Sequence, residues 1–369
     1  MKIVYFTHSL TSCWNHGNAH FLRGVLRELM ELGHEVVACQ PSDAWSLANL
    51  LADHGEAALE PFRAAYPELR VVSYAAEPDP QELLDGAALA IVHEWTEPAL
   101  VAALGRYGKS HPGLRLLFHD THHRAVSEPD AMRVYDLSGY DAVLAFGASL
   151  AEVYRSWGWG ERAFIWHEAA DTRHFRPPPS ATRREGLVWI GNWGDGERTA
   201  EIESFLLAPA AAAGLSLDIH GVRYPASADR LLARYGAHYR GWLANAAVPA
   251  TFARHLATVH VPRRYYASAL PGIPTIRVFE ALACGIPLVT APWQDSEHLF
   301  DPGRDYLVAA DGAEMTRHLR DLREDAALRS ELAGNGLATI EARHSCAHRA
   351  RELLAITARL GREQAEVAA

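Results

Sequence analysis

The sequence predicts two α/β domains, each built on a doubly wound parallel sheet, that face each other across a central cleft. Its 369 residues exceed what one hydrophobic core of ordinary size holds. Short apolar strands alternate with amphipathic helices in both halves of the chain, which is typical of parallel sheets covered on both faces. Three consecutive prolines with charged neighbours interrupt this alternation near residues 177–186, where we expect the linker.

In the first half, the opening strand "KIVYFTH" is followed by a helix over 20–33. Its apolar residues recur at helical spacing, and Gly33 can end it. Further strands are expected at 34–40, 69–74, 87–95, 114–120, 140–146 and 162–167. In the second half, strands are expected at 187–193, 215–221, 258–262 and 304–310. Helices are expected at 199–214 and 248–257, with a helix and strand within 274–289 and mostly helix after residue 313.

Composition and charge narrow the class of protein. Hydrophobic residues make up 49% and charged residues 22%, as in globular proteins. The net charge of −10 argues against a nucleic-acid partner. Four dispersed cysteines indicate reduced thiols and a cytoplasmic protein. The N-terminus begins with a strand rather than a secretory signal, and no apolar run reaches the ~20 residues of a membrane span. The composition gives no indication of the oligomeric state.

The segment "PTIRVFEALACGIPLV" combines a helix start with acidic and basic side chains. Pro274 fixes the approach, and the hydroxyl of Thr275 can cap the helix. The first turn, at Ile276, offers unpaired backbone amides and a partial positive charge that suit a diphosphate. Arg277 can add a bidentate phosphate contact, and Glu280, one turn on, can accept hydrogen bonds from a ribose or sugar diol. The alternatives are a surface ion pair for the arginine and a partly exposed helix carboxylate for the glutamate.

Here the sequence resembles a known family. "RVFEALACGIPLV", with the preceding "PGIPTI", resembles the nucleotide-sugar segment of GT-B glycosyltransferases, closest to spore-maturation-type glycosyltransferase-like proteins and glycosyltransferase family four. The segments "GHEVVA", "YDAVLAFGASLAEVYRSWG", "ADTRHFRP" and "VWIGNWGDGERT" agree in order, so the resemblance covers nearly the whole chain. Many family-four members have a second glutamate eight positions before Glu280, which contacts the donor sugar. This chain has Gly272 there.

The resemblance implies two Rossmann-like domains. It places an acceptor domain at 1–176, a linker at 177–186, a nucleotide-sugar donor domain at 187–345 and a final helix at 346–369 that packs back on the first domain. The implied activity is metal-independent transfer of a sugar from a nucleoside diphosphate to an acceptor hydroxyl, with Glu280 on the ribose of the donor. The partners are then a nucleotide sugar and an unidentified acceptor. No cofactor is expected, and UDP is favoured only by the class.

Two further segments of the second half suit a diphosphate. "GNWGDGERT" is a glycine-rich strand-to-helix loop in which Gly191 and Gly194 let the backbone approach a phosphate and Arg198 adds charge. Arg263 and Arg264 follow the strand at 258–262, also at a carboxyl edge, and could neutralise a leaving nucleoside diphosphate without a metal. The plain alternatives are turn-forming glycines and solvent-facing arginines.

The first half supplies candidate proton-transfer groups at strand ends. His20 is the candidate base for the acceptor hydroxyl, with Asp120 orienting its imidazole, and His119 is expected to line the cleft beside Asp120. A base from the first crossover with an aspartate from a later strand resembles inverting GT-B enzymes. The alternative roles are capping and packing.

Acceptor contacts are expected from His16 in the loop after the first strand, and from His93 and Trp95 in "VHEW". Trp95 could stack on a sugar ring, although a packing role is equally consistent with the sequence.

Parts of the sequence also fit other classes of protein. "HDTHH" could hold a metal, but neighbours on a strand point to opposite faces, and no HExxH helix accompanies them. The loop after the first strand lacks GxGxxG, so a dehydrogenase is disfavoured. A GT-B sugar epimerase and a non-catalytic nucleotide-sugar binder remain open alternatives.

Overall fold

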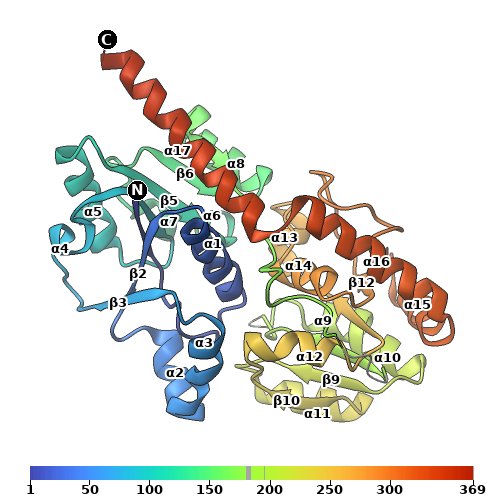
Figure 1. Ribbon diagram of the computed structural model, residues 1–369. Helices are drawn as coiled ribbons and strands as arrows, with labels where there is room; N and C mark the ends of the chain where they lie inside the picture. The colour runs from blue at the N-terminus through green and yellow to red at the C-terminus, as the bar shows by residue number, and fades with distance from the viewer. Residues whose placement is uncertain (180–183, 195, 369) are drawn as a thin grey trace. The chain divides into compact units, whose positions relative to one another are not determined.

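The computed structural model describes residues 1–179, 184–194 and 196–368. The chain divides into two compact units and passes between them twice. Unit 1 contains Met1–Glu168 and Cys346–Ala369, and unit 2 contains Ala169–Ser345 (Figure 1). The linker expected at 177–186 thus falls within the range of unit 2, and its residues 180–183 lie outside the described residues.

Unit 1 is built on a seven-stranded parallel sheet in the order β3-β2-β1-β4-β5-β6-β7. Its strands are β1 (Lys2–Phe6), β2 (Glu35–Pro41), β3 (Arg70–Tyr74), β4 (Ala87–His93), β5 (Arg115–Asp120), β6 (Ala142–Ala145) and β7 (Ala163–Ile165). Its α-helices are α1 (Ala19–Glu31), α2 (Trp45–His54), α3 (Glu60–Ala65), α4 (Pro80–Leu84), α5 (Pro98–Ser110), α6 (Arg124–Ser127), α7 (Pro129–Arg133), α8 (Ala148–Tyr154) and α17 (Cys346–Ala368).

The central strands of unit 1 are apolar because both faces of the sheet are covered. In β1, Val4 pairs with Val37 of β2 on one side and with Ala90 of β4 on the other. Val4 has no exposed surface, and neither has Ala90. A strand buried on both faces reads as a continuous apolar run rather than as an alternating one, which is why "KIVYF" was recognisable in the sequence.

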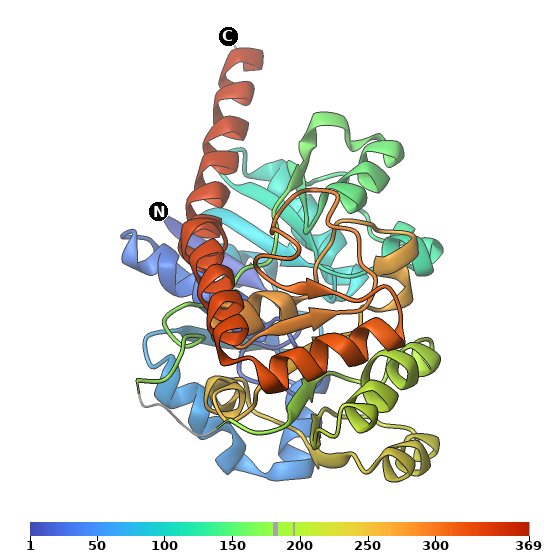
Figure 2. The ribbon, with the colours of Figure 1, turned by 90° about the vertical axis from the view of Figure 1, so that its right-hand side faces the viewer.

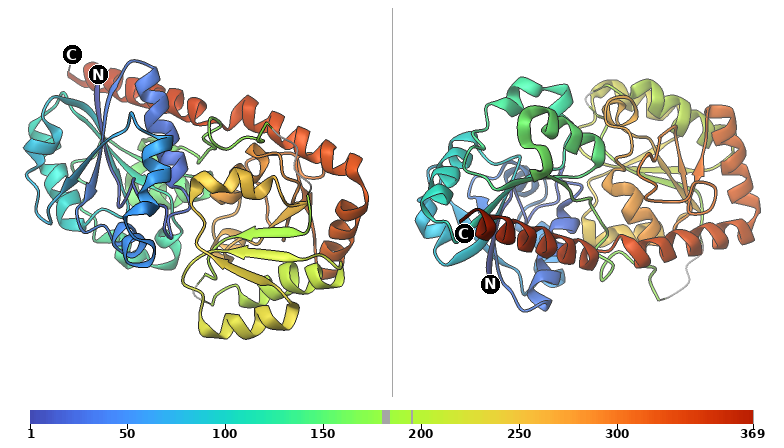
Figure 3. Two further views of the ribbon diagram at one scale, coloured as in Figure 1. Left: turned by 60° about the horizontal axis from the view of Figure 1, so that its bottom comes forward. Right: turned by 90° about the horizontal axis from the view of Figure 1, so that it is seen from above.

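Helix α17 brings the C-terminal part of the chain back to unit 1, where it lies beside α1 (Figures 1 and 3). Its first residue, Cys346, places its sulfur 3.6 Å from the carbonyl oxygen of Phe21 in α1. The indole of Trp166 donates to the carbonyl of Arg349 over 2.9 Å. Leu353, one turn later, is fully buried. These contacts make α17 part of the unit 1 core.

Unit 2 repeats the winding in a six-stranded parallel sheet, in the order β10-β9-β8-β11-β12-β13. Its strands are β8 (Leu187–Ile190), β9 (Leu217–His220), β10 (His238–Gly241), β11 (Ala257–His260), β12 (Leu288–Thr290) and β13 (Leu307–Val308). Its α-helices are α9 (Thr199–Ile202), α10 (Ala208–Ala212), α11 (Ala226–Tyr235), α12 (Val248–Phe252), α13 (Arg264–Ser268), α14 (Ile276–Ala283), α15 (Gly312–Glu324) and α16 (Ala326–Arg343). The predicted class of two doubly wound parallel sheets is confirmed.

The core of unit 2 joins the sheet to the helices that cover it, among them α15 and α16 (Figure 2). Met315 and Leu319 of α15 are fully buried against the same cluster as Ile219 of β9. Strand β10 carries no such signal in the sequence, because its polar residues "HYRG" lie at the sheet edge and are largely exposed. Within the described residues, no helix is long and apolar enough to span a membrane.

Candidate functional site

In both sheets the strand order changes direction near the centre. In α/β proteins, ligand sites lie at such a point of reversal. In unit 2 the reversal lies between β8 and β11, and in unit 1 it lies between β1 and β4. Ligands bind beyond the carboxyl ends of the strands at such a point. In unit 2 the loop 191–199 follows β8, and residues 261–264 follow β11. The predicted donor residues therefore gather at the edge that the topology favours.

A buried histidine ties this edge of unit 2 together. His260, the last residue of β11, lies 2.9 Å through Nδ1 from the hydroxyl of Thr290 at the end of β12. Its Nε2 lies 3.1 Å from the hydroxyl of Thr275, directly before α14. Burial, together with the charge of Arg198, lowers the pKa of His260 to about 3, so the ring is neutral. The expected cap is therefore wrong: among the described residues the Thr275 hydroxyl contacts His260 rather than an amide of α14.

The start of α14 carries the ion pair between Arg277 and Glu280. Ile276 begins the helix and is 7% exposed. Nη1 of Arg277 donates to Oε2 of Glu280 one turn later. The two side chains differ in burial, since Arg277 keeps 26% of its side-chain surface exposed and Glu280 keeps none. The carboxylate expected on the ribose is thus a buried group that holds an arginine at the helix start.

The loop after β8 is braced from inside. Arg198 is 8% exposed, and its Nη2 donates to the carbonyl of Asn192 over 2.5 Å. Its Nη1 donates to the carbonyl of Val261 after β11, so the arginine joins the two loops at the reversal. Gly194 adopts a φ of 83°, which glycine tolerates far better than other residues. The carbonyl of Gly191 accepts a hydrogen bond of 2.7 Å from the Tyr224 hydroxyl.

The other two predicted arginines differ in position. Arg263 follows β11, and its Nε lies 2.5 Å from Oε1 of Glu197 in the glycine-rich loop. Arg264 begins α13, is mostly exposed and lies 3.4 Å from Glu201. Arg263 therefore belongs to the same edge as Arg198, whereas Arg264 forms a solvent-exposed ion pair with Glu201.

The structure explains why position 272 has no side chain. Gly272 adopts a φ of 90°, and a Cβ added there would lie 2.3 Å from the Ser296 hydroxyl oxygen. The same point is 3.5 Å from Oε1 of Glu297. Any larger residue would need both a different backbone conformation and a shifted neighbour. This segment therefore excludes a glutamate at position 272.

The corresponding edge of unit 1 is lined with histidines. His8 follows β1, and its ring centroid lies 3.9 Å from that of His16 and 5.7 Å from that of His93 at the end of β4. Burial and the neighbouring His93 lower the pKa of His8 to about 3. Burial likewise lowers the pKa of His16. The pair is therefore neutral at physiological pH.

His93 is held by groups from neighbouring strand ends. Its Nδ1 lies 3.0 Å from Oε2 of Glu94, and its Nε2 lies 3.1 Å from the Thr121 hydroxyl. The hydroxyl of Thr121 is also 3.3 Å from Oε1 of Glu94 and 3.1 Å from the amide nitrogen of Asn18. His93 has no exposed surface, which suits a positioning residue better than a group that contacts acceptor directly.

His119 and Asp120 are both fully buried in β5. His119 Nδ1 lies 2.6 Å from the Tyr5 hydroxyl, and burial lowers the pKa of its imidazole. The carboxylate of Asp120 accepts hydrogen bonds from the Tyr154 hydroxyl over 2.7 Å and from the backbone N–H of His122 over 3.0 Å. Burial and the charge of Glu94 raise the pKa of Asp120 to about 8.

The predicted base, His20, lies in the first turn of α1 and has no exposed surface. Trp95, in contrast, is 45% exposed beside the histidine pair, at a ring-centroid distance of 6.4 Å from His8. Among the described residues, no three His, Cys, Asp or Glu side chains converge on a point where a metal ion could bind.

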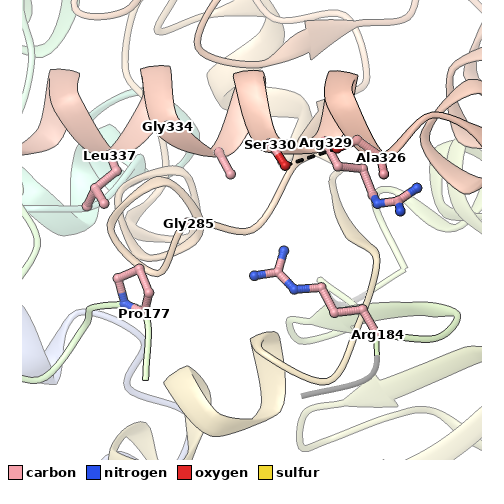
Figure 4. Close-up of a pocket in the computed structure, with 9 residues that line it drawn as sticks. Pro177, Arg184, Gly285, Ala326, Arg329, Ser330, Gly334 and Leu337 are labelled. Atoms are coloured by element: carbon pink, nitrogen blue, oxygen red, sulfur yellow. Dashed lines mark hydrogen bonds between the residues drawn. The ribbon is translucent and has the colours of Figure 1, made fainter. Parts of the chain in front are cut away.

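One cavity of unit 2 lies away from these residues. It has a volume of about 420 Å³ and is lined by α16 residues, by Pro177 and Arg184, and by Gly285 before β12 (Figure 4). Arg329 borders it, but its guanidinium donates to the carbonyls of Leu322 and Arg323. Gly285 precedes β12, so the cavity lies near the amino end of that strand. None of the predicted donor residues lines it.

The sequence comparisons agree with this geometry. Residues 198–355 match a family model described as glycosyl transferase-like. No curated protein matches the sequence. The chain has the GT-B fold.

Two solved structures illustrate the GT-B likeness. HepE (Alr3699) of Anabaena, solved in complex with UDP and glucose, has a TM-score of 0.66 and 14% identity over 96% of this chain and 98% of that chain. BGT of T4 phage, solved in complex with its UDP-glucose substrate, has a TM-score of 0.58 and 14% identity over 97% of this chain and 98% of that one. The predicted GT-B fold is confirmed, and the family match supports the predicted glycosyltransferase class.

Sequence reasoning missed two residues that organise the GT-B edge of unit 2. His260 was available as a histidine at the end of the strand "TVHVP", where a polar group after an apolar run signals a sheet edge. Tyr224, which holds Gly191, lies in a loop with no such signal.

Proposed function

We propose that this GT-B protein is a metal-independent glycosyltransferase that moves a sugar from a nucleoside-diphosphate sugar, UDP being favoured, to an acceptor hydroxyl. The observation that carries the proposal is the convergence of residues 191–194 and 196–199, Arg263 and the start of α14 at the reversal of the unit 2 sheet. Unit 2 is then the donor unit and unit 1 the acceptor unit. Among GT-B glycosyltransferases, we place the protein close to the spore-maturation-type and family-four group.

The electrostatics of this edge support a diphosphate. The first turn of α14 presents backbone amides and a partial positive charge, and Arg277 lies in that turn. Arg263 adds a second cation that remains partly exposed. The buried Arg198 braces the loop and contributes its charge from behind, without needing to touch the ligand.

The reaction needs charge stabilisation above all. The acceptor oxygen forms a bond to the anomeric carbon while the bond from that carbon to the phosphate oxygen breaks, and the nucleoside diphosphate leaves with the electron pair. Arginines and helix amides aimed at that leaving group stabilise it in the transition state. T4 phage BGT has been solved with UDP and Mn²⁺. Unchanged turnover of this protein in EDTA would support metal independence, and its loss would refute it.

The acceptor hydroxyl must also lose a proton. The proposal places this step at the neutral histidines of unit 1, where His8 and His16 lie side by side. His16 and His20 can serve only if the acceptor reaches side chains that are buried here. Single alanine variants of the three histidines identify the base: its loss lowers turnover and leaves donor affinity unchanged.

Glu280 is proposed to bind the ribose of the donor. Because its carboxylate is paired with Arg277, ribose binding must either share that carboxylate or turn the arginine toward the diphosphate. Thermal-shift titrations with UDP, GDP, ADP and their sugars test the donor site, since a ligand of the folded state raises its apparent stability. We expect Glu280→Gln to weaken UDP binding, and equal affinity would refute the role.

A non-catalytic nucleotide-sugar binder is the second candidate. It is favoured by Gly272, because many family-four members have a sugar-contacting glutamate at this position and the structure here leaves no room for one. Released nucleoside diphosphate separates the two. Release that requires an acceptor supports transfer, whereas binding of UDP-sugar without turnover over a broad acceptor panel supports the binder.

A further inference from the structure

The exposed side chains at the carboxyl edge of unit 1 carry a second inference. Large exposed hydrophobic side chains are few among the described residues, and two of them, Trp45 and Trp95, are tryptophans of this edge, 50% and 45% exposed. Trp45 begins α2 after β2, and Trp95 follows β4. These strands flank β1, so they stand about 10 Å apart at the usual strand spacing.

Both exposed rings are held in place by neighbours. The Trp45 ring packs edge-on against Trp14, at a centroid distance of 5.1 Å. Trp14 is itself 5% exposed, and its indole N–H donates to Asp53 over 2.9 Å. The hydroxyl of Ser46 donates to the carbonyl of Trp14 over 2.5 Å, which joins α2 to the loop after β1. An exposed indole fixed in this way loses little freedom on binding a ligand.

Trp95 is supported from one side by a cation. The guanidinium of Arg124 lies over the ring at 4.4 Å from its centroid, and the ring of His122 meets it edge-on at 5.4 Å. The ring of His8 lies on the side of β1, at 6.4 Å. Trp95 therefore forms a flat platform beside the neutral histidine pair.

The charge of this edge argues for an uncharged ligand. His8 and His16 bring no positive charge to this edge, because burial keeps both rings neutral. The flanking loops carry the exposed acids Asp43 and Glu97. The only cation described at the two rings, Arg124, is stacked on Trp95. A polyphosphate backbone requires clustered Lys and Arg, which these loops lack.

Resting on the function proposed above, we infer that the acceptor is a neutral saccharide whose sugar rings stack on Trp45 and Trp95 while their hydroxyls meet the partly exposed His8 between them. Sugar rings present apolar C–H faces to an indole and a rim of hydroxyls to hydrogen-bonding groups, which is the pairing of surfaces found here. Two rings on opposite sides of β1 suit an oligosaccharide better than a single sugar.

The test uses the full chain labelled with 5-fluorotryptophan and observed by ¹⁹F NMR. Single Trp→Phe variants assign the resonances of Trp45, Trp95 and Trp159. Trp159 is the matched control, because Arg162 stacks on it at 4.8 Å and it lies before β7, at the opposite edge of the sheet. The probes are neutral hexasaccharides of glucose, mannose, xylose and N-acetylglucosamine, a duplex DNA and a heparin hexasaccharide.

We expect at least one neutral hexasaccharide to shift the Trp45 and Trp95 resonances and to leave Trp159 unmoved. Its affinity should fall about tenfold in Trp45→Ala and Trp95→Ala, as for central aromatic anchors, and stay unchanged in Trp159→Ala. The inference is overturned if no neutral saccharide shifts the two rings, if Trp159 shifts equally, or if DNA or heparin shifts them instead.

A parallel UDP thermal shift separates the two proposals. If UDP binds but no neutral saccharide shifts the Trp45 and Trp95 resonances, only the saccharide acceptor is rejected and the donor function stands. Absent nucleotide binding rejects the donor function, whatever the tryptophans report.

Discussion

The pair formed by Arg277 and Glu280 predicts an asymmetry between two single substitutions. Arg277→Ala leaves the fully buried Glu280 carboxylate without its arginine. Loss of a partner from a buried ion pair costs about 3–5 kcal/mol. Glu280→Gln leaves a guanidinium that is 26% exposed and can be hydrated, so its cost is about 1 kcal/mol, that of one hydrogen bond. The arginine variant should therefore be less stable by about 2 kcal/mol or more.

Urea unfolding, monitored by hydrogen exchange in peptides of α14, measures this stability difference within unit 2. In a unit of this size each kcal/mol lowers the melting temperature by about 2–4 °C, so Arg277→Ala should melt roughly 6–20 °C below the parent protein. The double variant Arg277→Ala/Glu280→Ala is the control, because it removes the buried carboxylate together with the arginine and should restore part of the stability. The reasoning fails if Arg277→Ala is no less stable than Glu280→Gln, or if the double variant is the least stable of the three.

The other predictions concern strain and titration. Gly272→Ala should lower the stability of unit 2 by about 1–3 kcal/mol, because a Cβ at φ 90° meets the Ser296 hydroxyl, and Ser296→Gly should recover part of that loss in urea unfolding. The raised pKa of Asp120 means that the folded protein keeps a proton that the unfolded chain releases, so this stabilisation is lost as pH rises from 3.8 toward about 8; Asp120→Asn should flatten that slope in thermal unfolding. The lowered pKa of His8 has the opposite effect on stability, which falls as pH drops from 6.5 toward about 3 because the unfolded chain binds a proton that the folded protein does not. His8→Gln should reduce this fall in thermal unfolding. An unchanged pH dependence in either variant contradicts the assignment.

The sequence predicted what depends on local pattern. Central strands such as β1 and β4 are buried on both faces, and this burial demands the apolar runs that made them visible. The start of α14 was marked by Pro274 and the residues after it. Strand β10 was missed because an exposed edge strand need not be apolar.

The chemistry of the candidate site was less predictable, because it depends on partners far along the chain. Thr275 suited a helix cap, yet its hydroxyl meets His260, which another strand supplies. Arg198 looked like a phosphate ligand, yet it serves carbonyls on two loops. Asp120 was expected to orient an imidazole, and Tyr154 holds its carboxylate. Burial decides these roles, and a short sequence pattern does not report burial.

The two passages of the chain between its units bear on how the protein is made. Unit 2 is one continuous stretch of the chain, and its two ends are brought together by a β-bridge between Ala170 and Ser345. Unit 1 is split, and its helix α17 is encoded after the whole of unit 2. Domains generally fold as units during synthesis, usually starting with the N-terminal one. Here that order is inverted: unit 2 can complete its core first, while the face of α1 that receives α17 stays uncovered until α17 has been synthesised.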